Sequence, residues 1–333
     1  MKSTLVLAEK QSYFSKSHTD CIKGIFALMV VICHIWGQIS SEVNTGGFII
    51  HNLGRLFTIM GYISVSIFFF LSGYGLMSQH EKFGENYIKA FPKRNILSLY
   101  AINLFLIGLY CLFNVLMQVR LDLSILAFSL LYGNTIIPYG WYLQAIILFY
   151  IFFYISSLIT KKHMEKIIIV FFLLFIYCLV ANKFLSLTWY ECSFTFVLGM
   201  LFKIRKDRID SIIKRHYTLF LTFAILLFLL SCFWGNKTFS LIGIFLKIIS
   251  TILFCFVIVL LAMKVNFKNP LTTFLSNIYL EIYALQGITI AFFRSNIVYV
   301  KDAYLYGATV ILATVALAYI FHPVFRKILS FFK

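Results

Sequence analysis

Charged side chains are scarce in this sequence. Asp, Glu, Lys and Arg make up only 12% of its 333 residues, whereas 61% of the residues are hydrophobic. Soluble globular domains are about one quarter charged and much less apolar, so the composition excludes a soluble domain. A helix needs about 20 apolar residues to cross the hydrocarbon core of a bilayer, and the sequence contains many such runs. The chain is therefore predicted to be an integral membrane protein.

Several features that would indicate other architectures are also missing. The apolar runs show no period-two alternation, which excludes a transmembrane β-barrel and predicts an all-α fold. Linkers and low-complexity tracts are absent, so we expect residues 1–333 to form a single membrane domain with no appended soluble domain. The seven cysteines show no CxxC or Cys/His spacing. They are expected to pack in the core, without a metal site or a disulfide framework.

The length and position of the apolar runs predict about ten transmembrane helices. The expected spans are 20–40, 58–78, 95–117, 139–160, 166–182, 185–202, 217–235, 240–263, 272–293 and 303–322. A further segment, residues 121–133, is apolar but too short to span the bilayer. We expect this segment to be an interfacial or re-entrant piece on the outer side.

The Lys and Arg residues orient this map. Most of the 29 fall on alternate flanks that include both termini, among them the segment "KIRKDRIDSIIKRH". Because cytoplasmic flanks are enriched in Lys and Arg, both termini are predicted to face the cytoplasm of a multi-pass plasma-membrane protein. The net charge of +17 then lies beside anionic headgroups and requires no nucleic acid partner. The basic loops act as topology signals or attract an anionic cytosolic ligand.

Ionisable residues inside the expected spans are few and therefore informative, since each costs at least about 2.5 kcal/mol at mid-bilayer unless paired or hydrated. His34 is the histidine set well inside a span, and Glu191 and Glu281 are the intramembrane acids. At 100° per residue, Asp20 and Lys23 share one helix face with His34, and Lys23 is about 16 Å from His34 along the axis. A lone histidine of this kind is either a hydrogen-bonded structural residue or a catalytic one.

Two motifs carry a resemblance to a known family. The segment "DCIKGIFALMVVICH" holds an acid, a base three positions later and a histidine eleven after that, namely Asp20, Lys23 and His34. The segment "SIFFFLSGYGLM" contains a Phe-Phe-x-Leu-Ser-Gly pattern ending at Ser72 and Gly73. Both patterns resemble those of the acyltransferase-3 family of polytopic membrane acyltransferases. The family normally has Arg at the position that is Lys23 here.

Weaker similarities to the same family extend along the chain. "PKRNI" with Arg94 resembles the basic start of the third span, and "YGWYLQAIILFY" with Trp141 resembles the opening of the fourth. "SFTFVLGMLF" resembles a Phe-x-x-Gly segment, and "SNIYLEIYALQGI" resembles a late element in which Gln286 stands where a histidine is frequent. The Leu-Glu-Ile-Tyr form of this element is most similar to the branch of fucose O-acetylase-like and capsule or exopolysaccharide acetyltransferases.

The resemblance implies transfer of an acyl group, usually acetyl, from cytosolic acyl-CoA to a hydroxyl of a glycan outside or in the membrane. It implies that His34 is the general base for that hydroxyl, or an acylated relay, with Asp20 and Lys23 as its partners on the catalytic face. Donor phosphates are expected at Lys23, Lys93 and Arg94. A role for the pair Ser72 and Gly73 at the donor site is weighed against simple helix packing.

The residues expected at the acceptor are Trp141, Glu191, Glu281 and Gln286. Either acid could instead make an interhelical hydrogen bond, and Glu281 or Glu191 could orient His34. Acetyl-CoA is expected as a donor substrate, with no tightly bound cofactor. The rival functions are a flippase or exporter of a lipid-linked sugar and a non-catalytic scaffold. Transporters tend to show internal repeats and helices broken by Gly or Pro at matching positions, and the sequence shows neither pattern.

Overall fold

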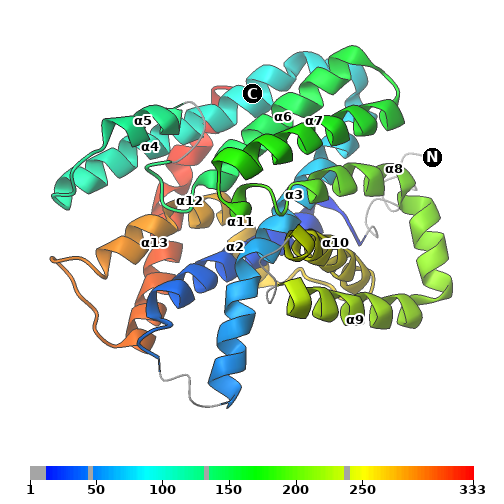
Figure 1. Cartoon of the computed structure of the whole chain (residues 1–333). Helices are drawn as coiled ribbons and strands as arrows, with labels where there is room; N and C mark the ends of the chain where they lie inside the picture. Colours follow the sequence, from blue (N-terminus) through cyan, green and yellow to red (C-terminus); the bar gives the residue numbers. More distant parts are fainter. Residues whose placement is uncertain (1–12, 44–47, 131–134, 236–240) are drawn as a thin grey trace.

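The computed structural model describes residues 13–43, 48–130, 135–235 and 241–333, which form helices joined by short connections (Figure 1). The all-helical expectation is confirmed, because these residues contain no strand and only one isolated bridge, between Arg294 and Tyr299. In chain order the elements are α2 (Lys16–Ile39), α3 (Phe48–Phe91), the π-helix η2 (Pro92–Leu97), α4 (Ser98–Leu116), α5 (Leu123–Leu130), α6 (Trp141–Ile159), α7 (His163–Phe184), the 3₁₀ helix η3 (Leu187–Trp189), α8 (Phe194–Arg215), α9 (Tyr217–Gly235), α10 (Leu241–Ala262), α11 (Pro270–Asn277), α12 (Tyr279–Phe292) and α13 (Ala303–Ser330).

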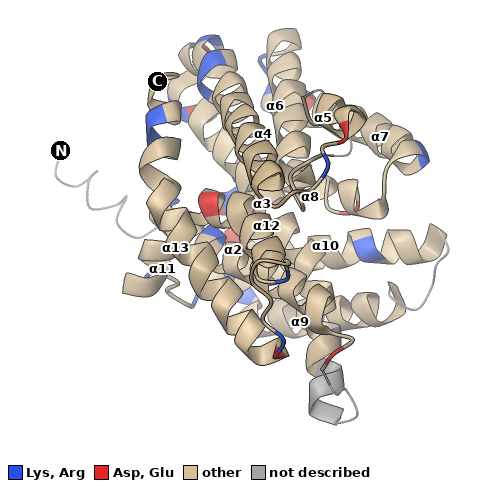
Figure 2. Ribbon diagram, turned by 90° about the vertical axis from the view of Figure 1, so that its left-hand side faces the viewer, with Lys and Arg blue, Asp and Glu red and all other residues tan. Residues whose placement is uncertain are grey.

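Seven helical stretches in the described part of the chain are long and apolar enough to cross a membrane. Six of them are α2, α6, α7, α9, α10 and α13, and the seventh runs from Leu56 to Leu116 through α3, η2 and α4. That last stretch covers two of the expected spans, 58–78 and 95–117. Eight of the ten expected spans therefore correspond to the seven helical stretches. Figure 2 shows that three of their helices, α4, α6 and α9, carry no charged residue.

The expected span 185–202 is not formed as one helix. The chain makes the short helix η3 and further turns before α8 begins at Phe194. The second half of α8 carries the basic segment that starts at Lys203, which was expected to be a loop. Only the first part of α8 is apolar, and this part is too short to span a bilayer.

The expected span 272–293 is also broken. Ile278 has φ −122° and ψ 15°, and it separates the eight-residue helix α11 from the 14-residue helix α12. Asn269 caps α11, because its side chain accepts from the Thr272 N–H while the Thr272 hydroxyl accepts from the Asn269 N–H. The short apolar segment expected at 121–133 contains α5 and ends in residues outside the described ranges.

Helix α2 lies at the centre of the bundle and packs against α3, α11, α12 and α13. One contact depends on glycine, because a Cβ on Gly24 would lie 2.7 Å from the Ser276 nitrogen and 2.8 Å from the Leu275 carbonyl carbon. The missing side chain lets the backbones of α2 and α11 approach closely. This approach positions the face of α2 that carries Asp20, Lys23 and His34.

Helices α3 and α8 make a second close contact. A Cβ on Gly73 would collide with the carbonyl oxygen of Phe196, and a Cβ on Gly199 would collide with that of Phe70. The glycine of the Leu-Ser-Gly motif on α3 thus faces the backbone of α8, and the glycine of the Phe-x-x-Gly motif on α8 faces the backbone of α3. Gly73 therefore serves helix packing in this structure.

Candidate active site

The amino-terminal half of α2 brings two predicted residues into an ion pair. Lys23 Nζ lies 3.2 Å from Asp20 Oδ1, three residues earlier on the helix. The same ammonium lies 5.3 Å from the centroid of the Tyr279 ring of α12, a cation–π distance. These contacts hold Lys23 at the wall of a cavity rather than in bulk solvent.

This cavity has a volume of about 480 Å³ and lies between α2, α3, α6 and the start of α12. We call it the inner cavity because it lies at the end of α2 that is predicted to face the cytoplasm. Its charged lining residues are Lys16, Lys23, Lys82, Arg94 and Asp20. Cations therefore outnumber the single carboxylate. Ser72 also lines it, whereas Lys93 is exposed and does not. The inner cavity can accept an anionic ligand.

The His34 side chain is fixed on two sides. Its Nδ1 lies 2.9 Å from Gln286 Oε1 of α12. Its ring stacks on the Tyr139 ring with 3.7 Å between centroids and 14° between planes. Gln286 is fully buried, and its Nε2 donates to the Tyr283 carbonyl at 2.9 Å.

This hydrogen-bond chain assigns the tautomer of His34. The Tyr283 carbonyl only accepts, so the Gln286 amide nitrogen must face it and Oε1 must face the imidazole. Nδ1 of His34 is then the donor, and Nε2 carries the lone pair. Nε2 makes no hydrogen bond with any described residue. A neutral imidazole in this state can accept a proton from a hydroxyl.

Tyr139 is a functional candidate that the sequence motifs did not identify. Its φ of 64° is unusual for a residue with a side chain. The Tyr283 hydroxyl donates to its carbonyl, and Gln38 Nε2 donates to its hydroxyl at 3.3 Å. The surroundings therefore hold Tyr139 in an uncommon backbone conformation against His34. The only sequence signal for this turn is its position between Pro138 and Gly140.

A second cavity has His34 in its lining, and we call it the outer cavity because it lies towards the end of α2 that is predicted to face outside. Its volume is about 380 Å³, and it is lined by residues that include His34, Trp141, Glu191, Lys247 and Tyr283. An adjoining hollow of about 310 Å³ is lined by His34 and Tyr139 together with Gln38. The structure thus brings His34, Trp141 and Glu191 together as predicted acceptor-side residues. Lys247 of α10 also lines this cavity.

Glu191 is the buried acid of the outer cavity, with a relative exposure of 3%. It lies in the turns between η3 and α8, outside the seven candidate spans. Burial raises the pKa of its carboxyl, and the charge of Lys247 opposes that rise. A carboxyl in this setting can donate or accept a hydrogen bond to a polar ligand.

One pair of aromatic rings lies between the two cavities. Tyr142 lines the inner cavity and Tyr283 lines the outer one. Their ring centroids are 5.2 Å apart in an edge-to-face arrangement, and Phe68 packs against both rings at 5.6 and 6.3 Å. We call these three residues the aromatic partition. The aromatic partition thus joins a residue that lines one cavity to a residue that lines the other.

Two of the residues predicted at the acceptor, Glu281 and Gln286, line neither cavity. The Glu281 carboxylate accepts a 2.7 Å hydrogen bond from His322 Nδ1 of α13, so it joins α12 to α13 and makes no contact with His34. Gln286 holds His34 and lines neither cavity. Glu281 therefore corresponds to the interhelical alternative, and Gln286 acts through His34.

Comparison with known proteins adds one finding. A family model described as an acyltransferase domain matches residues 19–322. The match contains Lys23, His34 and Arg94, together with every other residue predicted for the site. No curated protein and no solved structure matches the chain.

Proposed function

The chain belongs to the acyltransferase-3 family of membrane acyltransferases, and from this premise we propose that it is an acyl-CoA-dependent O-acetyltransferase. The proposed acceptor is a hydroxyl group of a cell-surface polysaccharide or lipid-linked glycan. The observation that carries the proposal is the placement of two cavities along one face of α2, with a cationic lining in one and His34 in the other. The aromatic partition lies between them.

The charge of the inner cavity supports the donor. Coenzyme A carries phosphates that pair with Lys and Arg through charge-assisted hydrogen bonds. Lys23 and Arg94 line the cavity, and the only carboxylate among its described lining residues, Asp20, already pairs with Lys23. The acyl-pantetheine arm would then extend from these cations along α2 and past Tyr142 towards His34.

The tautomer of His34, with the proton on Nδ1 and the lone pair on Nε2, supports its role as general base. Nε2 would take the proton of the acceptor hydroxyl as the hydroxyl oxygen attacks the thioester carbonyl carbon. The new C–O bond forms, the C–S bond breaks, and the proton passes to the departing thiolate of CoA. Gln286 would hold the imidazole in the required tautomer throughout. An acylated imidazole would use the same nitrogen.

The lining of the outer cavity supports a sugar acceptor. Trp141 lines it, and the Trp141 ring lies 6.2 Å from that of Trp189, so a pyranose ring has an aromatic surface to pack against. Glu191 and Lys247 supply polar groups in the same lining. Such a mixture of aromatic surface with a few polar groups is typical of small-ligand sites.

The proposal is tested by measuring the affinity of the purified protein for acetyl-CoA in two neighbouring variants. Arg94→Ala should weaken binding about tenfold, because hydrogen bonds to charged groups contribute about 1.5–3 kcal/mol. Lys93→Ala is the matched control and should stay within about twofold of wild type, since Lys93 does not line the inner cavity. Equal effects of both variants would contradict this donor site. Glycan export without acetyl transfer would instead favour an exporter.

A further inference from the structure

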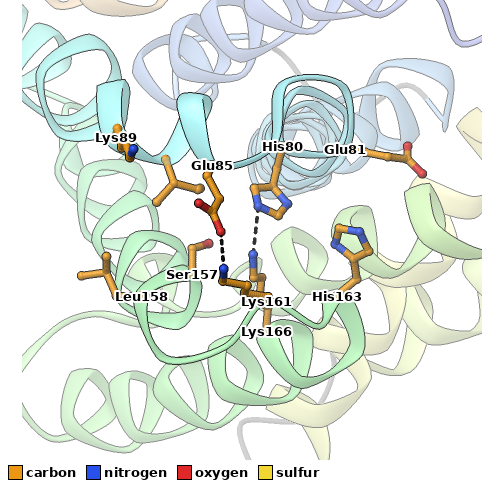
Figure 3. A pocket seen from close by; sticks show the side chains of 11 residues that line it. His80, Glu81, Glu85, Lys89, Ser157, Leu158, Lys161, His163 and Lys166 are labelled. Carbon is orange, nitrogen blue, oxygen red and sulfur yellow. Dashed lines mark hydrogen bonds and ion pairs between the residues drawn. The ribbon is translucent and has the colours of Figure 1, made fainter.

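A third cavity lies at the carboxyl-terminal end of α3, beside the end of α6 and the start of α7 (Figure 3). Its volume is about 420 Å³, and it shares no lining residue with the inner cavity. On α3 it is lined by His80 and Gly84, whereas Ser78 and Lys82 line the inner cavity. These positions fall on opposite faces of the helix, so the third cavity is a separate site.

The centre of the third cavity is a buried lysine. Lys166 has a relative exposure of 1%, and its Nζ lies 2.9 Å from His80 Nε2. No carboxylate among the described residues forms an ion pair with Lys166. A buried ammonium without an anion is strongly unfavourable. No described residue neutralises an ammonium at this position, so an anion bound in the cavity would stabilise the charged form of Lys166.

The surrounding polar atoms lack partners as well. When Lys166 is charged, its ammonium only donates, so His80 Nε2 accepts and the His80 proton is on Nδ1. That Nδ1 is buried without a hydrogen-bond partner, as are Ser157 Oγ and His163 Nδ1. Seven side-chain atoms are in this condition among the described residues, and three of them belong to residues lining this one cavity. Because native proteins leave few buried polar atoms unpaired, this clustering points to a missing ligand.

The carboxylates at the rim are already paired. Glu85 forms an ion pair with Lys161, and Glu81 forms one with Lys203 of α8. In Figure 3 the Glu81 side chain is directed away from Lys166, and the Lys161–Glu85 pair lies beside the Lys166–His80 pair. Neither acid therefore supplies the charge that Lys166 requires.

We propose that the third cavity binds a phosphate group, held by Lys166, His80 and Ser157. Phosphate offers several charged acceptor oxygens to donors that approach from different directions. Its source is either an anionic phospholipid or a soluble phosphate ester. Leu158 and Ile159 at the end of α6 are 63% and 65% exposed, so lipid chains would have an apolar surface near the cavity. Basic pockets between membrane helices at the cytoplasmic side are known to suit anionic headgroups.

The proposal is tested by thermal unfolding of the purified full-length protein in a neutral detergent. The added probes are phosphatidylglycerol, phosphatidylcholine with the same chains, and inorganic phosphate against chloride at equal ionic strength. A ligand that binds only the folded state raises the melting temperature in a saturable way. The variants are Lys166→Met and Ser157→Ala, and Lys327→Met is the control because Lys327 is an exposed lysine of α13.

We expect phosphatidylglycerol or inorganic phosphate to stabilise the wild type and Lys327→Met. Ser157→Ala and Lys166→Met should each weaken the apparent affinity about tenfold or more. Ser157→Ala should retain or raise the ligand-free melting temperature, because it removes an unpaired hydroxyl. A response to phosphatidylglycerol alone identifies the lipid source, and a response to inorganic phosphate identifies the soluble source. No saturable response, an equal response to phosphatidylcholine, or variants that respond like the wild type would overturn the proposal.

Discussion

The hydrogen bond between His34 and Gln286 gives the most quantitative prediction. Replacing Gln286 with Leu removes the acceptor that fixes Nδ1–H at 2.9 Å, and it removes the side-chain hydrogen bond to the Tyr283 carbonyl. A neutral hydrogen bond contributes about 0.5–1.5 kcal/mol net. If all of that orients the catalytic tautomer, kcat should fall about 2- to 13-fold. The KM for acetyl-CoA should stay unchanged, because Gln286 does not line the inner cavity.

Two further variants make this prediction specific. Gln286→Glu in its protonated form reproduces both hydrogen bonds, so it should retain more activity than Gln286→Leu. Gln144→Leu is the matched control, since Gln144 is also buried but lines neither the inner nor the outer cavity. The assay is initial-rate acetyl transfer at varied acetyl-CoA concentration, with folded protein quantified in each preparation. An unchanged kcat in Gln286→Leu, or an equal loss in Gln144→Leu, would refute the assignment of the His34 tautomer.

Three other predictions concern donor binding, topology and packing. Lys23→Ala should raise the KM for acetyl-CoA, whereas Lys23→Arg should keep most of the activity. Steady-state kinetics of the two variants test this, and a change in kcat alone would refute phosphate binding by Lys23. An engineered cysteine at Ser211, in a background without the seven native cysteines, should not react with impermeant thiol reagents in intact cells but should react after lysis. Labelling in intact cells would contradict the predicted topology. Gly199→Ala should destabilise the fold by about 1–3 kcal/mol, because its Cβ would collide with the Phe70 carbonyl. Gly37→Ala is the control and should not destabilise the fold, because its Cβ meets open space. Equal melting temperatures of the two variants would contradict the close α3–α8 contact.

The face of α2 could be predicted from the sequence because it depends on one helical repeat. Asp20 and Lys23 form a pair three residues apart, and His34 lies further along the same helix. Periodicity within one helix is a local property. The contacts that give these residues their chemistry come from other helices. Gln286 and Tyr139 are far from His34 in sequence, and nothing in their own neighbourhoods specifies that they meet His34.

The two broken spans illustrate a second limit. A hydropathy window averages over residues, so it does not register that the chain leaves the helix at Ile278, which is neither Pro nor Gly. In the same way, the apolar residues around η3 and the start of α8 combine into one run although turns separate them. Tertiary packing overrides local propensity at both places, because α11 and α12 pack against α2, whereas α8 packs mainly against α3.

The role of His34 is the central claim, and it is tested most directly by acetyl transfer in His34→Ala. Radiolabelled acetyl-CoA is supplied to membranes from expressing cells, and label in the glycan is measured beside acetyl-CoA binding by the purified variant. General base catalysis contributes about 10²- to 10⁴-fold. We therefore predict a rate at least about 100-fold below wild type, with acetyl-CoA affinity and membrane abundance near wild type. A His34→Ala protein that transfers acetyl at the normal rate would contradict the account.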